Sequence, residues 1–189
     1  MRIFSFRPSL TLRGREFHGL RGFAGKPFHP PLTDIPVGAY LLAAVFDVVS
    51  RVGYEQSWSR DFYRAASFVL LGGAAVSVLA AFTGFLDWLR TTEKGNQARR
   101  TVNAHAWTMI TLTLVVLVDI GLRVFSYWDE SSTPLPLVVL TVAAALVTFV
   151  GSTIGGSLVF DYGFNVETAG DHPAWHPSEQ DVLPGHKAS

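Results

Sequence analysis

The chain has 189 residues, of which 49% are hydrophobic and 16% are charged, whereas soluble domains usually carry about a quarter charged residues. Its formal net charge is zero, and it contains no cysteine. The lack of cysteine excludes disulfides, thiolate catalysis, zinc or iron–sulfur clusters held by cysteine, and haem attached through a Cys-x-x-Cys-His motif. The length suits one domain, and the composition indicates a membrane protein.

Residues 1–33 form a basic N-terminal segment with a single acid, Glu16, and no apolar core. We therefore expect no cleaved secretory signal, but a segment that lies on the anionic inner leaflet of a membrane. The proline-rich end of this segment predicts a helix that begins near Asp34, with Pro36 in its first turn. His29 is then expected just outside the helix.

Four apolar stretches reach or approach the length of about 20 residues that is needed to cross a bilayer. They are Ile35–Val52, Ala65–Leu86, Thr101–Leu122 and Pro134–Phe160. In lipid the backbone must satisfy its own hydrogen bonds, so each stretch is predicted to be a helix. Because the connections are short, neighbours should be antiparallel. The sequence thus predicts an all-α, up-down-up-down four-helix transmembrane bundle over residues 34–162.

Residues 163–189 are polar and contain proline, which predicts a flexible C-terminal tail. The tail contains three histidines, His172, His176 and His186. A metal-binding tail is one interpretation, but we favour a solvated segment.

Small residues spaced by four allow membrane helices to approach closely. Three such pairs occur in the second and fourth spans: Gly73 with Ser77, Gly151 with Gly155, and Ser152 with Gly156. We expect these faces to be contacts between helices.

Basic residues are distributed unequally between the two sides of the bundle. Side A, which holds the N-terminus, receives 11 of them, and side B receives 4. Those of side A are Arg2, Arg7, Arg13, Arg15, Arg21, Lys26, Arg90, Lys94, Arg99, Arg100 and Lys187; those of side B are Arg51, Arg60, Arg64 and Arg123. Positively charged loops stay in the cytoplasm, so both termini are predicted to be cytoplasmic.

Side A also gathers a set of polar residues that lie within or next to the spans. They are His29, Asp34, Thr83, Asp87, Arg90, Arg99, Arg100, Asn103, His105, Ser157 and Asp161. Polar groups are costly in a membrane and often mark a functional site. His105, about one turn inside the third span, is either a haem or metal ligand or a residue that joins helices through a hydrogen bond to Asp34, Asp87 or a backbone carbonyl.

Two neutral imidazoles can ligate one haem iron, and helix bundles often hold such cofactors. A b-type haem between His29 and His105 is therefore one hypothesis, with Arg99 and Arg100 pairing with the propionates and Asn103 on the same helix face as Arg99. A metal ion held by His29, Asp34, Asp87 and His105 is another. The alternative for His29 is a solvated residue in the proline-rich lead-in.

Side B has two acid–base pairs spaced by four, Asp47 with Arg51 and Asp119 with Arg123. Such spacing allows an ion pair within one helix. We interpret both as structural anchors, because no further chain of polar residues supports a proton relay.

Four segments resemble one known family in their order along the chain: Phe28–Gly38, Thr83–Trp88, Arg99–Ala106 and Gly155–Val166. The family is the bacterial membrane-protein family of domain of unknown function 2231, and the resemblance covers residues 25–168. It implies a four-helix protein of the bacterial inner membrane whose activity is not established. The match carries over His29, Asp87, Arg100, His105 and the pair Gly155-Gly156.

The chain departs from this resemblance at two positions of interest. Many relatives have His where this chain has Asp34, and some have His where it has Ser157. If those positions supply ligands in the relatives, this chain lacks them.

Some relatives are fused to Rieske iron–sulfur or c-type cytochrome domains, which implies electron transfer. The segment Trp175–Gly185 resembles the linker that leads into the Rieske domain. Because this chain has no cysteine to hold a cluster, a redox partner is expected to be a separate protein.

Three functions remain. The first is a membrane electron-transfer or cofactor-anchoring subunit, and the second is a non-catalytic scaffold that binds a partner protein. A transporter ranks last, because internal repeats and broken helices are not evident. No residue stands in a recognisable hydrolase setting, whether the chain is an enzyme stays open, and no nucleic-acid partner is expected.

Overall fold

The computed structural model describes residues 27–90 and 95–164. These residues form four helices, α1 (His29–Val52), α2 (Ser59–Arg90), α3 (Gln97–Phe125) and α4 (Leu135–Phe160). All four are long and apolar enough to cross a membrane. The predicted all-α four-helix bundle is confirmed. The predictions for residues 1–26 and 165–189, including the histidines of the tail, lie outside the described residues.

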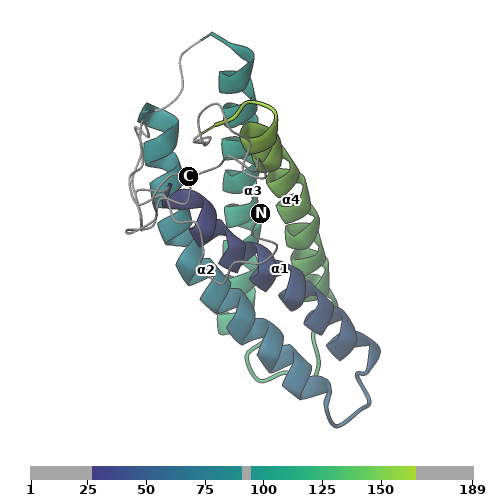
Figure 1. Cartoon of the computed structure of the whole chain (residues 1–189). Helices are drawn as coiled ribbons and strands as arrows, with labels where there is room; N and C mark the ends of the chain where they lie inside the picture. Colours follow the sequence, from purple (N-terminus) through teal and green to yellow (C-terminus); the bar gives the residue numbers. More distant parts are fainter. Residues whose placement is uncertain (1–26, 91–94, 165–189) are drawn as a thin grey trace, which may run out of the picture.

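Successive helices run in opposite directions, so the topology is up-down-up-down (Figure 1). Helix α1 packs mainly against α2 and also against α4, and α3 packs mainly against α4. Of the four helix pairs that are in contact, α2 and α3 have the smallest contact. The bundle therefore consists of two helix pairs, α1 with α2 and α3 with α4. We call the end with the start of α1 and the end of α4 the histidine end, and the opposite end the arginine end.

Helix α1 begins at His29, before the predicted start near Asp34. Pro30 and Pro31 occupy its first turn, where a missing N–H leaves no hydrogen bond unmade. The hydroxyl of Thr33 donates to the carbonyl of Pro30 at 2.7 Å. Pro36 is inside the helix, so the prediction that it belongs to the first turn was wrong, and His29 is part of α1.

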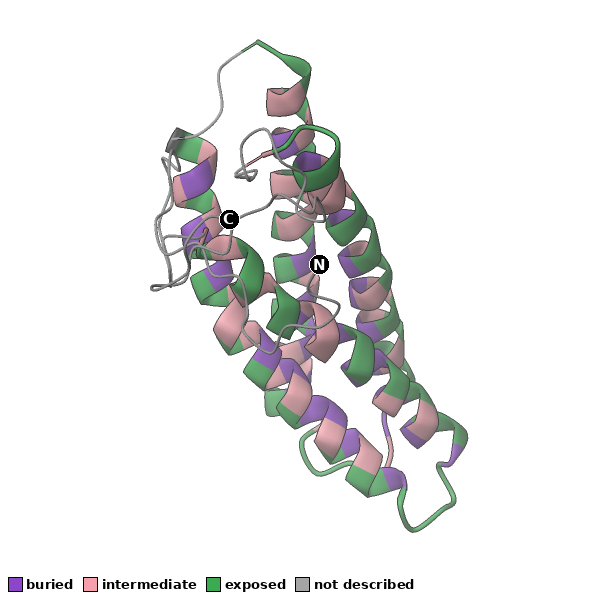
Figure 2. Ribbon diagram, viewed as in Figure 1, coloured by how far each residue is buried: buried purple, intermediate pink, exposed green. Residues whose placement is uncertain are grey.

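Buried residues line the inside of the bundle and exposed ones its outside (Figure 2). The buried set mixes apolar residues with polar ones, whereas many of the exposed residues are large and hydrophobic. Large exposed residues include Phe68, Phe82, Leu114, Leu146 and Phe149. Water would disfavour such a surface, whereas lipid tails match it. The distribution supports contact with a lipid bilayer around the bundle.

Glycine residues mark the closest approaches between helices. A Cβ atom at Gly73 would lie 2.6 Å from the Cβ of Ala39, so α1 and α2 come together there. A Cβ at Gly151 would collide with the side chain of Met109 on α3. These two positions bear out the predicted contact faces.

The other predicted pair on α4 behaves differently. Ser152 is exposed, and a Cβ at Gly156 would meet only Phe160 of its own helix. The prediction that Ser152 and Gly156 form a contact between helices was wrong within the described bundle.

Candidate functional site

His29 connects the start of α1 to α2. Its Nδ1–H donates to the carbonyl of Ala80 at 2.8 Å, and Nδ1 lies 3.3 Å from the hydroxyl of Thr83. A carbonyl can only accept, so this contact places the proton on Nδ1. The ring lies against Gly84, where a Cβ would stand 2.6 Å from its Cε1 atom. The imidazole is therefore fixed in position and tautomer.

His105 plays the corresponding part between α3 and α4. Its Nδ1–H donates to the carbonyl of Gly151 at 3.0 Å, and a Cβ at Gly155 would stand 3.2 Å from its Cε1 atom. Of the hydrogen-bond partners that the sequence left open, the backbone carbonyl is the one present.

The two imidazoles come from different helix pairs, and both lie at the histidine end of the bundle. Each uses Nδ1 for a backbone carbonyl. Within the described part of the chain, neither ring makes a hydrogen bond through Nε2. The structure thus places both histidines at the same end of the bundle, each with one ring nitrogen available among the described residues.

The other predicted haem contacts belong to a contact between α2 and α3. The guanidinium of Arg99 lies 5.1 Å from the centre of the Trp88 ring and donates to the Trp88 carbonyl at 2.8 Å. The indole N–H of Trp88 donates to the amide oxygen of Asn103 at 2.9 Å. Arg99 and Asn103 are therefore engaged by protein, whereas Arg100 is exposed and donates to Gln97.

The four predicted metal ligands do not form one cluster. Asp34 is exposed on α1, and Asp87 is buried on α2. Among residues 27–90 and 95–164, no three His, Asp or Glu side chains are arranged to hold a metal ion.

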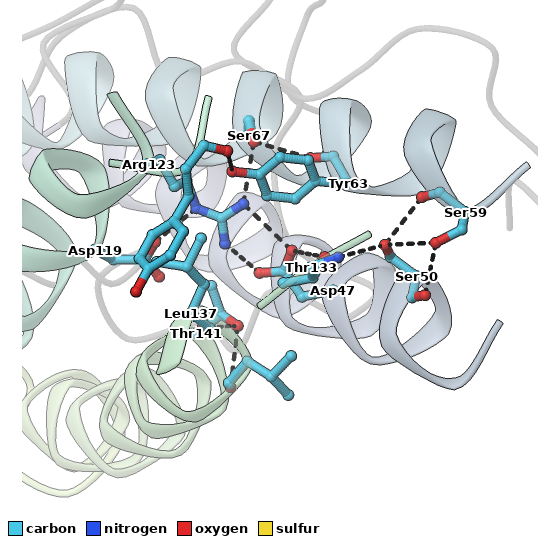
Figure 3. A network of polar contacts seen from close by, with 12 residues as sticks. Asp47, Ser50, Ser59, Tyr63, Ser67, Asp119, Arg123, Thr133, Leu137 and Thr141 are labelled. Carbon is cyan, nitrogen blue, oxygen red and sulfur yellow. Dashed lines mark hydrogen bonds and ion pairs between the residues drawn. The ribbon is translucent and has the colours of Figure 1, made fainter. Parts of the chain in front are cut away.

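The largest polar cluster is at the arginine end, where the sequence suggested only local anchors (Figure 3). Arg123 of α3 is 1% exposed and donates through Nη1 and Nη2 to both carboxylate oxygens of Asp47 on α1. Its Nε–H donates to Asp119 at 2.6 Å, and Nη1 also reaches the hydroxyl of Ser67 at 3.0 Å. The predicted pair of Asp119 with Arg123 is confirmed.

The predicted pair of Asp47 with Arg51 was wrong. Asp47 is fully buried, whereas Arg51 is exposed on the outer side of the helix end. Arg123 of α3 takes the place of Arg51 as the partner of Asp47. Arg123, unlike Arg51, is buried in the interior, where the charge of the Asp47 carboxylate must be compensated.

Polar side chains from the connecting segments extend this cluster. The hydroxyl of Thr133 donates to Asp47 at 2.9 Å, and the backbone N–H of Thr133 donates to Ser50 at 2.9 Å. Ser50 and Ser59 each donate to the carbonyl of the other, at 2.9 and 2.8 Å. The cluster therefore ties α1, α2, α3 and the start of α4 together, as the dashed lines in Figure 3 show.

Tyr63 of α2 covers the guanidinium. Its ring centre lies 5.4 Å from the central carbon of Arg123, and its hydroxyl donates to the carbonyl of Tyr127 at 2.6 Å. A cluster of polar residues that the sequence analysis did not predict is thus present at the arginine end. Its members all come from sequence positions near the same membrane end, and this shared position could have predicted that they meet.

A family model described as "Predicted membrane protein (DUF2231)" matches residues 25–168. The chain belongs to this family. The DUF2231 match includes all four helices, both histidines and the whole Arg123 cluster. No curated protein and no solved structure is significantly similar to the chain. The family assigns a membrane location, and any function must be argued from the two ends of the bundle.

Proposed function

We propose that the chain is a membrane subunit that holds a b-type haem or a metal ion between His29 and His105. The observation that carries this proposal is the identical hydrogen-bonding state of the two rings: each gives Nδ1–H to a carbonyl, and Nε2 of each has no hydrogen-bond partner among residues 27–90 and 95–164. Histidines that ligate metals commonly donate their other ring N–H to a carbonyl or carboxylate, which fixes the ring and its tautomer.

The local residues fit a site held by two histidines better than a carboxylate-rich metal site. Gly84 and Gly155 each make room for one imidazole, which occupies the place where a side chain would otherwise begin. Asp34 is exposed, so it is not part of the same buried group. With no cysteine in the chain, haem would be bound noncovalently, and it would supply one-electron transfer when bound.

The roles of the arginines are revised in this proposal. Arg99 is occupied by Trp88, which leaves Arg100 as the better candidate for a haem propionate. A guanidinium suits a carboxylate because it can donate two parallel hydrogen bonds. Electrons would then be exchanged with a separate redox protein at the same end of the bundle.

The test is an optical spectrum of the detergent-purified protein from cells supplied with haem, recorded oxidised and after reduction with dithionite, with metal analysis of the same sample. We expect a Soret band, and its loss in His29→Ala and in His105→Ala. His18→Ala, which changes a histidine of the N-terminal segment, is the matched control and should keep the band. A colourless protein without bound metal would reject the proposal.

A second candidate is a scaffold that binds a partner protein. The Nδ1–H contacts join α1 to α2 and α3 to α4, and the Trp88 contacts join α2 to α3, so these contacts also stabilise the bundle without any cofactor. A scaffold would be colourless, and its histidine variants would lose stability in proportion to lost partner binding. Co-purification from crosslinked membranes distinguishes the two functions.

The proposed setting is the inner membrane of a bacterium, with the histidine end and both termini in the cytoplasm. The excess of basic residues on that side supports this orientation. A haem or metal at the histidine end would then exchange electrons with a cytoplasmic partner.

A further inference from the structure

The cluster at the arginine end contains two carboxylates and one guanidinium. Asp47, Asp119 and Arg123 are 0%, 1% and 1% exposed. With every group ionised, the three side chains would carry a net charge of −1 inside the bundle. An uncompensated buried charge is expensive, and such a group usually becomes neutral instead. One proton shared with the cluster would make it neutral.

The two carboxylates are not equivalent. Asp47 accepts from both terminal nitrogens of Arg123 and from the hydroxyl of Thr133. Asp119 accepts from Arg123 through Oδ1 alone, and its Oδ2 is buried without a hydrogen-bond partner in the described part of the chain. Asp47 is therefore the carboxylate with several hydrogen-bond donors (Figure 3). The oxygen without a donor is Oδ2 of Asp119.

We propose that Asp119 is a proton-binding site: Oδ2 carries a proton, while Asp47 is the ionised partner of Arg123. A proton taken from water at the arginine end forms the O–H bond on Oδ2, and no electron transfer is involved. A neutral hydroxyl without a partner costs less in this interior than a partly compensated negative charge. This site is independent of the proposed haem or metal, because it lies at the other end of the bundle.

Among the described residues that face this site, Arg123 is the cation that balances the charge of the two carboxylates. Helix α1 contributes Asp47, and α2 contributes Tyr63, whose ring lies over the guanidinium. Helix α4 contains no charged residue. Glu130 is exposed in the connection between α3 and α4, and it is a further acidic residue near Tyr63.

The direct test is an infrared spectrum of the full chain in lipid nanodiscs, with ¹³C-labelled aspartate, at neutral pH. We expect the carbonyl band of a protonated carboxylic acid in the difference spectrum of wild type minus Asp119→Asn. A difference spectrum without this band overturns the proposal. The band should also disappear in Asp47→Asn, because Asp119 then becomes the counter-ion of Arg123; its persistence there would contradict the charge argument.

The melting temperatures of Asp119→Asn and Asp47→Asn also test whether the two carboxylates differ in protonation. Asp119→Asn replaces a neutral acid by a neutral amide of the same shape, so its melting temperature should stay close to that of wild type. Asp47→Asn removes the ionised partner of Arg123 and should melt at a clearly lower temperature. Equal losses in the two variants would overturn the assignment of the proton to Asp119.

The spectrum of the unmodified protein covers the case in which a variant does not fold. Without the acid band from labelled aspartate in wild type, the proposal fails whatever the variants do. Exchange of potassium for sodium at fixed pH should leave the band unchanged. Its loss in sodium would show that a cation, and not a proton, is the ligand.

Discussion

Arg123 is the most connected side chain of the described structure. It is 1% exposed, and it interacts with Asp47 of α1, Tyr63 and Ser67 of α2, and Asp119 of its own helix. A guanidinium presents five donors in one plane, which lets one side chain serve several helices at once. A lysine could replace the charge but not this geometry.

We predict that Arg123→Met lowers the free energy of unfolding by about 3–5 kcal/mol, because it leaves buried Asp47 without its cation. Chemical or thermal unfolding in detergent measures this loss. Arg51→Met is the control at the same end of the bundle; Arg51 is exposed, so its removal should change stability by about 0.5 kcal/mol at most. A larger effect at Arg51 than at Arg123 would favour the local pair that the sequence suggested.

The two predicted ion pairs show what residue spacing along one helix can and cannot predict. Asp119 and Arg123 share one helix, so their spacing was sufficient to predict the pair. Asp47 and Arg51 have the same spacing, but Asp47 turns inward and finds a cation from α3. The spacing of residues along one helix does not tell which of several cations at a membrane end enters the interior.

At the scale of elements, close approach between α1 and α2 depends on Gly73. The expected Cβ position lies 2.6 Å from the Cβ of Ala39, so a methyl group there would force the two helices apart. We predict that Gly73→Ala destabilises the protein by about 1–3 kcal/mol, as overpacking does elsewhere.

The neighbouring Gly72 provides a matched control for that prediction. A Cβ at Gly72 would have no atom within 4 Å, so Gly72→Ala should be neutral or should stabilise the helix by up to about 1 kcal/mol. Comparison of unfolding transitions for the two variants isolates the contact from helix propensity. Similar values for both would contradict a close approach at Gly73.

Helices α2 and α3 touch least, so the contact of Trp88 with Asn103 should contribute measurably to their association. Trp88→Phe removes the indole N–H and leaves the amide oxygen of Asn103 without this donor. We predict a coupling energy of about 1 kcal/mol between the two positions. A double-mutant cycle with Asn103→Ala measures it, and a coupling near zero would show that the hydrogen bond contributes nothing to stability.

The sequence predicted the four helices well, because long apolar stretches in lipid leave few alternatives. It predicted their ends less well. The third apolar stretch begins at Thr101, whereas α3 begins at Gln97, so the helix includes Arg99, which contacts Trp88. At the histidine end the sequence named His29 and His105 but not their carbonyl partners, since a backbone acceptor leaves no trace in the sequence.

At the scale of the whole molecule, the two ends of the bundle differ in kind. The histidine end joins helices through histidine, tryptophan and backbone carbonyls. The arginine end is closed by one buried ionic cluster and the short connections around it. If both proposals hold, a redox site and a proton site lie at opposite ends of the same bundle, each available to a different aqueous phase.

That arrangement depends on which way the bundle crosses the membrane, and single cysteines can determine it, because the chain has none of its own. Glu55→Cys and Asp129→Cys place thiols in the exposed connections of the arginine end, and Gln97→Cys places one at the histidine end. We predict that a membrane-impermeant maleimide labels positions 55 and 129 in intact bacterial cells.

Position 97 should react only after the cells are lysed, because the proposed orientation, based on the excess of basic residues, puts the histidine end in the cytoplasm. Positions 55 and 129 control for each other, since an up-down-up-down bundle requires them to react alike. Labelling of position 97 alone in intact cells would invert the orientation and would place the proposed haem or metal on the outer side. Labelling of 55 without 129 would contradict the bundle topology itself.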